Sequence, residues 1–401
     1  MGNGIKGRGV LLAVGTVVLL FAGIIYAWSI MKVPFINDFG WNESQLGVNY
    51  TFLVAFFCIG TIVAGRLGKI TTPAFRLDLG GILFCIGFII VSQMEDNIAV
   101  LYGAYGILGG FGIGLVYITT IGVVNSWFPD KIGLSSGIIL MGFGLNSLTI
   151  GKLANYCFDA PGIGWRTTYL VLGIVTAVVC IIASFVLKPV PEGTIFPPAK
   201  NEKNKSVVEN DFTPLQMVKR PSFWKLMVFY SLLASVGSVS ISFAKDIMLD
   251  TGTVEAFAIT MVGIVSIGNG AGRLFSGWLF DRIGLAGSKY VTSILAVVAT
   301  LLVAFALQIQ NSPLAYIGLF LCYLSFGFVA TGLTAFTTAF YGQKNFSLNF
   351  GILNLHLIAT AFSSAIAGSL KVVTGSFILI FLILSGLSAF VFLLSLTIKK
   401  P

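Results

Sequence analysis

The chain has 401 residues, of which 56% are hydrophobic and only 10% are charged. A soluble globular protein carries about 25% charged residues, so this composition excludes a soluble domain and indicates a protein that lies in lipid. A net charge of +9 would suggest nucleic acid as a partner for a soluble protein. Here the basic residues follow membrane topology instead, and we expect no nucleic acid partner.

Twelve apolar stretches of roughly 20 residues follow one another, each long enough to cross a hydrocarbon core about 30 Å thick. The first follows Lys6 and Arg8 as the apolar part of a signal peptide would, but it continues to Pro34 without a small-residue cleavage site. We therefore interpret it as the first transmembrane helix. The predicted helices are residues 10–31, 44–67, 74–94, 97–124, 132–156, 166–188, 222–246, 252–281, 287–309, 313–341, 347–371 and 375–398.

Basic residues gather at the start of the chain, in every second connection and at the tail, as the positive-inside rule requires. They are Lys6, Arg8, Arg66, Lys69, Arg76, Lys131, Lys200, Lys203, Lys205, Lys219, Arg220, Arg282, Lys289, Lys344, Lys399 and Lys400. The alternate connections are richer in acidic residues. An even number of helices with both ends in the cytoplasm satisfies this pattern, which predicts a multi-pass protein of the cell membrane.

A polar stretch separates two groups of six predicted helices. Residues 189–221 hold most of the chain's Pro, Asn and Lys density, and we interpret them as a cytoplasmic linker. In this interpretation residues 1–188 and residues 222–401 each form a six-helix bundle. The predicted fold class is therefore an all-α membrane protein of two bundles, a class in which transporters bind their substrates near the bilayer midplane.

Several chemistries are not indicated by the sequence. The five cysteines are scattered in or beside apolar segments without a C-x-x-C pair, so neither a disulfide framework nor a metal site is predicted. We expect no cofactor, and because no ATP-binding motif is present, a gradient must drive any transport. A membrane enzyme would need a metal cluster or a nucleophile and base at depth, and a single histidine argues against that class.

Arg273 is the one charged residue deep inside an apolar stretch, whereas every Asp and Glu lies at or beyond the end of one. Charge within a membrane is costly, so it usually marks a pathway or a binding site. A guanidinium presents a planar fork of donors that matches a carboxylate. The sequence therefore predicts that Arg273 binds an anionic ligand. The alternative is a structural charge satisfied by backbone carbonyls or water between helices.

The segment from Gly277 to Gly284 fits the pattern G-x-x-x-D-[RK]-x-G and resembles the loop signature of the major facilitator superfamily. The resemblance implies the major facilitator fold and a gating motif made of Gly277, Asp281, Arg282 and Gly284. The equivalent stretch of the first half has Gly68 where the acidic residue would be.

A closer resemblance is to the oxalate:formate antiporter family and its monocarboxylate transporter relatives. It rests on Trp127-Phe128-Pro129-Asp130-Lys131-x-Gly-Leu-x-Ser-Gly, on Asn269-Gly270-Ala271-Gly272-Arg273, on Asn349-Phe350-Gly351 and on Tyr26-Ala27-Trp28-Ser29. The resemblance implies that Arg273 grips a substrate carboxylate. Oxalate-specific members carry a lysine where Leu357 stands, and His356 precedes it. Eukaryotic-type monocarboxylate transporters carry an aspartate where this chain has Asn269, which cannot ionise.

His356, the only histidine, is the predicted proton-coupling residue, because imidazole titrates near physiological pH. The alternative for His356 is a plain hydrogen bond to a neighbour such as Asn354. Tyr26 and Tyr117 carry a hydroxyl on an aromatic ring, which suits a carboxylate pocket, although both could simply pack the bundle. The predicted substrate-binding set is Arg273, His356, Tyr26, Tyr117, Asn269 and Asn354.

These observations predict a monomeric secondary transporter that moves a small organic anion by alternating access. A monocarboxylate such as lactate, pyruvate or formate, coupled to a proton, is the first expectation. Exchange of anions of the oxalate:formate type is the alternative. A transporter-like metabolite receptor is a further class, but it would normally need an added cytoplasmic domain.

Overall fold

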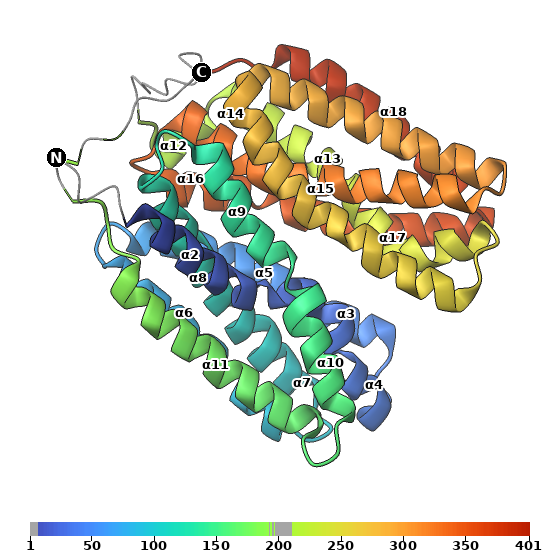
Figure 1. The fold of residues 1–401 in the computed structure, drawn as a ribbon, viewed down its shortest axis with the longest axis horizontal. Helices are drawn as coiled ribbons and strands as arrows, with labels where there is room; N and C mark the ends of the chain where they lie inside the picture. The colour runs from blue at the N-terminus through green and yellow to red at the C-terminus, as the bar shows by residue number, and fades with distance from the viewer. Residues whose placement is uncertain (1–6, 192, 195, 197–210) are drawn as a thin grey trace. The chain divides into compact units, whose positions relative to one another are not determined.

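The computed structural model describes residues 7–191, 193, 194, 196 and 211–401. In this part of the chain every regular element is a helix (Figure 1), because backbone groups in lipid must be hydrogen-bonded within their own segment. Eleven helical segments are long and apolar enough to cross a membrane. One of them, Thr260–Gln308, has 49 residues, and the positive φ of 73° at Gly284 divides it into two. The segments thus supply twelve crossings, which confirms the all-α prediction.

The first six crossings are built from α2 (Arg8–Ala22), η1 (Gly23–Ala27), α3 (Trp28–Met31), α5 (Glu43–Leu67), α6 (Pro73–Gln93), α7 (Ile98–Leu101), η2 (Tyr102–Gly109), α8 (Gly110–Ser126), α9 (Ile132–Gly144), η3 (Ser147–Gly151), α10 (Lys152–Asp159) and α11 (Gly164–Val186). The short α4 (Val33–Phe39) follows α3. The other six are built from α13 (Pro221–Asp250), α14 (Glu255–Gln308), α15 (Ser312–Tyr341), α16 (Phe346–Leu353), α17 (His356–Thr374) and α18 (Ile378–Thr397), and α12 (Pro214–Val218) precedes them.

Helix starts follow residues that satisfy the free amides of a first turn. Asn42 and Gln45 form a reciprocal capping box before α5. The Thr72 hydroxyl accepts a bond from the Phe75 amide, and Pro73 occupies the first position of α6. Asn311 caps α15 in the same way through the Leu314 amide. These caps explain why the predicted segments 44–67, 74–94 and 313–341 begin within two residues of the observed helices.

Four predicted continuous helices are interrupted. The first passes through the 3₁₀ turn η1, and the fourth and fifth contain the π-helical turns η2 and η3. The eleventh breaks at the turn of Asn354 and Leu355 between α16 and α17. Apolar periodicity cannot reveal such breaks, because the residues on both sides of each break remain apolar.

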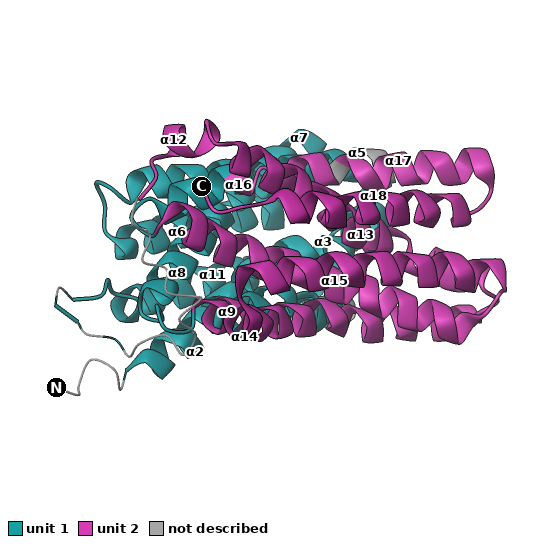
Figure 2. Cartoon of the chain, turned by 90° about the horizontal axis from the view of Figure 1, so that it is seen from above, with its two compact units in different colours: residues 1–131, 138–199, 343–352 teal, residues 132–137, 200–342, 353–401 magenta. Residues whose placement is uncertain are grey.

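The chain forms two compact units (Figure 2). Unit 1 comprises residues 1–131, 138–199 and 343–352, and unit 2 comprises residues 132–137, 200–342 and 353–401. The start of α9 thus belongs to unit 2, and most of α16 belongs to unit 1. The predicted division at residues 188 and 222 stays a prediction. Much of the predicted linker, including Lys200, Lys203 and Lys205, lies outside the described residues, as does Lys6.

Candidate functional site

Arg273 lies in the middle of the first half of α14 and is 1% exposed. Its Nε donates a hydrogen bond of 3.2 Å to Oδ1 of Asn269, one helical turn earlier. The Arg273 carbonyl accepts a bond of 3.0 Å from the Thr331 hydroxyl on α15. The structure therefore fixes both the backbone and the Nε edge of this residue. Asn269, predicted as a direct ligand, orients the guanidinium through its side-chain amide.

A close crossing of α14 and α15 holds this geometry. A Cβ atom on Gly327 would lie 2.3 Å from the Asn269 carbonyl oxygen and 2.8 Å from the Arg273 amide nitrogen. A Cβ atom on Gly272 would lie 2.2 Å from the Leu324 carbonyl oxygen. Small residues permit such backbone approach in lipid, where packing drives helix association. The glycines therefore set the position of the Arg273 backbone.

His356 is the first residue of α17, directly after the break in the eleventh crossing, and is 2% exposed. Its Nδ1 lies 3.1 Å from the carbonyl oxygen of Leu353. Its Nε2 is buried and has no hydrogen-bond partner in the part of the chain that the structure describes. The Tyr230 ring of α13 lies beside it, with a centroid distance of 6.2 Å. The imidazole thus makes a hydrogen bond to a neighbour, as the alternative interpretation allowed, with the Leu353 carbonyl rather than Asn354 as its partner.

The Leu353 contact fixes the tautomer of the neutral imidazole. A carbonyl oxygen only accepts hydrogen bonds, so Nδ1 must carry the proton that points at Leu353. Nε2 of the neutral ring is then an acceptor and would repel a carboxylate oxygen. Protonation converts Nε2 into a donor. This site can therefore hydrogen-bond a carboxylate only after His356 takes up a proton.

Asn354 lies in the turn before His356 and is 3% exposed. Its backbone carbonyl accepts a bond of 3.1 Å from the Leu357 amide, which starts α17. Asn354 therefore helps to form the break in the helix. Its predicted part in substrate binding stays a prediction.

Tyr26 and Tyr117 are brought together in unit 1 around one aromatic ring. Phe143 of α9 lies 5.4 Å from Tyr26 and 4.9 Å from Tyr117 between ring centroids. Tyr117 is buried, whereas Tyr26 in η1 is half-buried. Tyr50 of α5, which the sequence did not single out, lies close to Tyr26. A lone tyrosine in an apolar segment gives no signal of this proximity.

The predicted set is thus divided between the two units. Arg273, Asn269, His356 and Asn354 belong to unit 2, and the two tyrosines belong to unit 1. A common pocket for all six remains a prediction.

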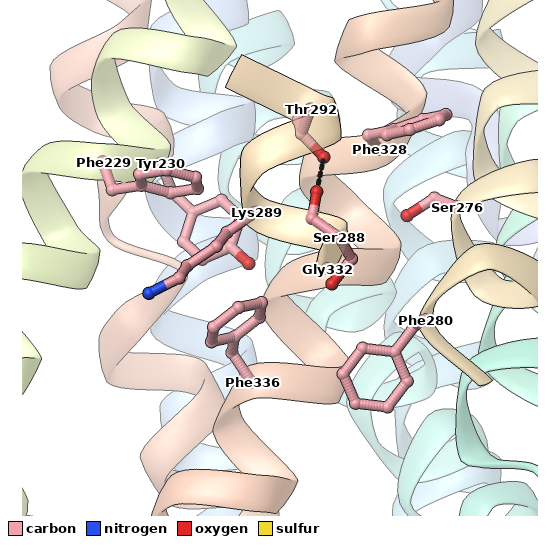
Figure 3. A pocket seen from close by; sticks show the side chains of 10 residues that line it. All are labelled: Phe229, Tyr230, Ser276, Phe280, Ser288, Lys289, Thr292, Phe328, Gly332 and Phe336. Atoms are coloured by element: carbon pink, nitrogen blue, oxygen red, sulfur yellow. Dashed lines mark hydrogen bonds between the residues drawn. The ribbon is translucent and has the colours of Figure 1, made fainter. Parts of the chain in front are cut away.

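Lys289, predicted to mark the eighth connection, is a buried cation near the start of the ninth crossing. It lies in α14 beyond Gly284, is 6% exposed, and donates a bond of 2.7 Å to the Ile398 carbonyl at the end of α18. A cation is favoured there because carbonyls at a helix end carry partial negative charge. Beside Lys289 lies a cavity of about 10 Å³ that Tyr230, Ser276 and Phe336 help to line (Figure 3). It has room for about one water molecule and is too small for a carboxylate substrate.

The gating motif binds the start of another helix within unit 2. The Asp281 carboxylate accepts bonds of 3.1 Å and 2.8 Å from the amides of Gly133 and Leu134, in the first turn of α9. A Cβ atom on Gly277 would lie 2.1 Å from the Gly133 carbonyl oxygen. Gly284 supplies the positive φ between two crossings, and Arg282 lies over the Trp278 ring at 5.4 Å. Asp281 therefore caps a helix that begins 149 positions earlier.

Asp281→Asn should weaken this cap, because it removes the negative charge that faces the amides and the positive end of the helix dipole. We expect a loss of roughly 0.5–2 kcal/mol. The measurement is the melting temperature of the purified protein, which should fall by a few degrees. Asp246→Asn, which alters an exposed carboxylate of α13, should leave it unchanged. Equal shifts in both variants would contradict the capping role.

In the first half, the region at the end of α5 that corresponds to the gating motif has other contacts. A Cβ atom on Gly65 of α5 would lie 2.5 Å from the Leu348 amide nitrogen of α16, so these two elements also meet backbone to backbone. Gly68 provides no carboxylate there. Arg76 instead donates a bond of 3.3 Å to the Ala64 carbonyl near the end of α5. The predicted departure at Gly68 thus leaves a cationic group at a helix end, where the dipole favours it.

Comparison with known proteins gives a consistent family. Residues 12–357 match the model of the Major Facilitator Superfamily. The oxalate:formate antiporter of Oxalobacter formigenes is 25% identical over 82% of this chain and 77% of its own length. Monocarboxylate transporter 12 of Xenopus laevis is 25% identical over 82% of this chain and 75% of its own length. An uncharacterised MFS-type transporter of Escherichia coli, YhjX, is 25% identical over 85% of this chain and 83% of its own length.

Solved structures show the same fold. The fucose:proton symporter of Escherichia coli superimposes with a TM-score of 0.72 at 13% identity, and the match covers 98% of this chain and all of that chain. A bacterial homologue of the iron transporter ferroportin gives a TM-score of 0.70 at 15% identity, with coverage of 98% and 99%. At such identities the similarity concerns the fold alone.

Proposed function

Since the chain belongs to the Major Facilitator Superfamily, and is therefore a multi-pass membrane transporter and not an enzyme, we propose that it carries small organic anions. The substrates are monocarboxylates such as lactate, pyruvate or formate. Transport occurs by alternating access and is coupled to protons. The basic residues of alternate connections support a placement in the cell membrane with both chain ends in the cytoplasm.

The observation that carries this proposal is the guanidinium of Arg273, which is almost fully buried within a membrane span and is held at Nε by Asn269. A guanidinium that is already held in place loses less conformational entropy when a ligand binds, and it matches a carboxylate in shape and charge. A pair formed away from water is also stronger than one at a surface. Arg273 thus favours carboxylates over neutral substrates.

The names of two relatives support the same substrate class. One is an oxalate:formate antiporter and the other is a monocarboxylate transporter, and both are matched over more than four fifths of this chain. Arg273 offers one guanidinium fork, which matches one carboxylate rather than two. Anion exchange is the second candidate, because one of the relatives is an oxalate:formate antiporter and because a gradient of one carboxylate can drive the entry of another.

Proton coupling is supported by the hydrogen bonds of His356. Because Nδ1 donates to Leu353, the ring offers a carboxylate a donor at Nε2 only in its protonated form. Binding of the anion and uptake of the proton then favour each other, as thermodynamic linkage requires. An anion and a proton would be carried together.

Counterflow in proteoliposomes tests the proposal. Vesicles loaded with unlabelled lactate should accumulate labelled lactate and formate, whereas labelled fucose should stay outside. Labelled oxalate should accumulate much less than lactate, because one guanidinium fork faces two carboxylates. Vesicles without protein are the control. Accumulation of none of the carboxylates, by protein that is folded and inserted, would contradict the proposed substrate class.

A further inference from the structure

Two irregular turns lie against each other in unit 1. The first crossing changes from the α2 helix to the 3₁₀ turn η1 at Gly23. The fifth crossing leaves α9 at Gly144 and continues through the π turn η3, where the Gly151 amide bonds to the Asn146 carbonyl at 2.9 Å. Turns of both kinds inside transmembrane helices often mark hinges or functional sites. A contact between η1 and η3 should therefore involve specific residues.

Asn146 joins the two turns. Its Nδ2 donates a bond of 2.7 Å to the carbonyl of Leu20, which lies in the last turn of α2. Carbonyls of a last turn lack a donor within their own helix, so the amide satisfies one of them. Asn146 is 0% exposed, and its Oδ1 has no partner within the described part of the chain. The side chain thus has one strong contact, and that contact is with the point where the first crossing changes its winding.

Glycines make this contact a tight one. A Cβ atom on Gly23 would lie 2.2 Å from the Phe143 carbonyl oxygen and 2.8 Å from Cβ of Asn146. A Cβ atom on Gly142 would lie 2.6 Å from the Thr16 carbonyl oxygen. The two helices therefore touch along their backbones on both sides of the Asn146 bond. Neither can slide along the other without breaking that bond or opening the crossing.

The winding of η1 decides where Tyr26 points. A 3₁₀ helix turns about 120° per residue and an α-helix about 100°, so the two differ by about 20° at each step. Tyr26 is the fourth residue of η1, and a return to α-helical winding would turn its side chain by roughly 80° about the helix axis. Its contact with the Phe143 ring, on the same helix as Asn146, belongs to the 3₁₀ form.

We propose that Asn146 is a positioning residue that holds η1 in the 3₁₀ form and so directs the Tyr26 hydroxyl toward the substrate. The inference rests on the proposed function, in which Tyr26 contacts a carboxylate. In α-helical winding the Ile24 amide would bond to the Leu20 carbonyl, to which the Asn146 amide donates here. The Asn146 side chain thus enters the ladder of backbone bonds at this point, as inserted side chains do where helices change their winding, and so sets the orientation of Tyr26.

The first arm of the test needs no substrate. Asn146→Leu removes the donor at similar volume, and hydrogen exchange of the purified transporter reports the amides of residues 23–27. We expect the Ile24 amide to exchange more slowly by about tenfold, because in α-helical winding it gains a buried hydrogen bond to the Leu20 carbonyl. Tyr169→Phe is the matched control, since it removes a bond of 2.7 Å to the Met31 carbonyl, farther along the same crossing. It should leave residues 23–27 unchanged.

The second arm is a double-mutant cycle in lactate exchange. Tyr26→Phe and Asn146→Leu should each raise the half-saturation concentration, and the double variant should be no worse than the poorer single variant within about twofold. A merely structural role would make the two effects multiply. If Asn146→Leu does not fold, Asn146→Ala removes the same bond without adding volume.

The outcomes separate this inference from the proposed function. Multiplying effects, or unchanged exchange of residues 23–27, would overturn the inference while the wild-type protein still exchanges lactate. Absence of lactate exchange by the wild type would overturn the proposed function, and the hydrogen-exchange arm would still report on Asn146.

Discussion

Replacing Arg273 with alanine is expected to abolish most carboxylate exchange. The variant removes a buried charge-assisted pair, which corresponds to roughly 2–4 kcal/mol, or about 30-fold to 1,000-fold in half-saturation concentration. The measurement is counterflow of labelled lactate in proteoliposomes containing equal amounts of folded protein. The loss should appear mainly as weaker binding, because in the proposed function the guanidinium pairs directly with the substrate carboxylate.

Two further variants sharpen this test. Arg273→Lys keeps the charge but loses the planar fork and the Nε bond to Asn269, so it should recover only part of the exchange. Arg220→Gln alters an exposed arginine that lies over the Phe212 ring, and it should exchange lactate like the wild type. Full exchange by Arg273→Ala would show that the carboxylate binds elsewhere.

Replacing His356 with glutamine is expected to remove the pH dependence of lactate binding. In the wild type the imidazole must be protonated to donate from Nε2, so the affinity is highest at low pH. It should fall by up to about tenfold per pH unit once the pH exceeds the pKa of His356 in the empty transporter. A glutamine amide donates at any pH. The half-saturation concentration of the variant should therefore stay nearly flat.

Lactate exchange with the same pH on both sides of the vesicle isolates binding from the driving force of a proton gradient. Between about pH 5.5 and about pH 8 the protonated fraction of an imidazole falls as the pH rises, so the affinity should change across this range. Tyr230→Phe changes the ring beside His356 without removing the imidazole, so it should keep the wild-type profile. An unchanged profile in His356→Gln would assign the pH dependence to another group.

The sequence predicted the parts of the fold that depend on composition. Twelve apolar segments were placed within a few residues of the observed helices, because a span of lipid demands a fixed length of apolar chain. The twelfth crossing emerges only when Gly284 divides the long α14 helix. The sequence also singled out Gly284, as part of a motif.

The sequence could not predict the contacts that give the site its chemistry. The partner of Asp281 is the start of α9, far away in the chain, and the partner of Lys289 is the end of α18. The tautomer of His356 depends on a helix break that leaves the Leu353 carbonyl within its reach. Such partners are set by packing between helices, and one sequence carries no record of that packing.

The contrast between Asp281 and Gly68 makes the two halves of the transporter unequal. At the end of the eighth crossing, the Asp281 carboxylate accepts hydrogen bonds from two backbone amides of α9. Where α5 meets α16, Gly65 lies close to the Leu348 backbone, and Gly68 supplies no carboxylate. Opening the Asp281 junction would break two hydrogen bonds to a carboxylate, a contribution that Gly68 cannot make at the other junction. The two halves should therefore differ in how they respond to the loss of one charge, because only the Asp281 junction depends on a carboxylate at this position.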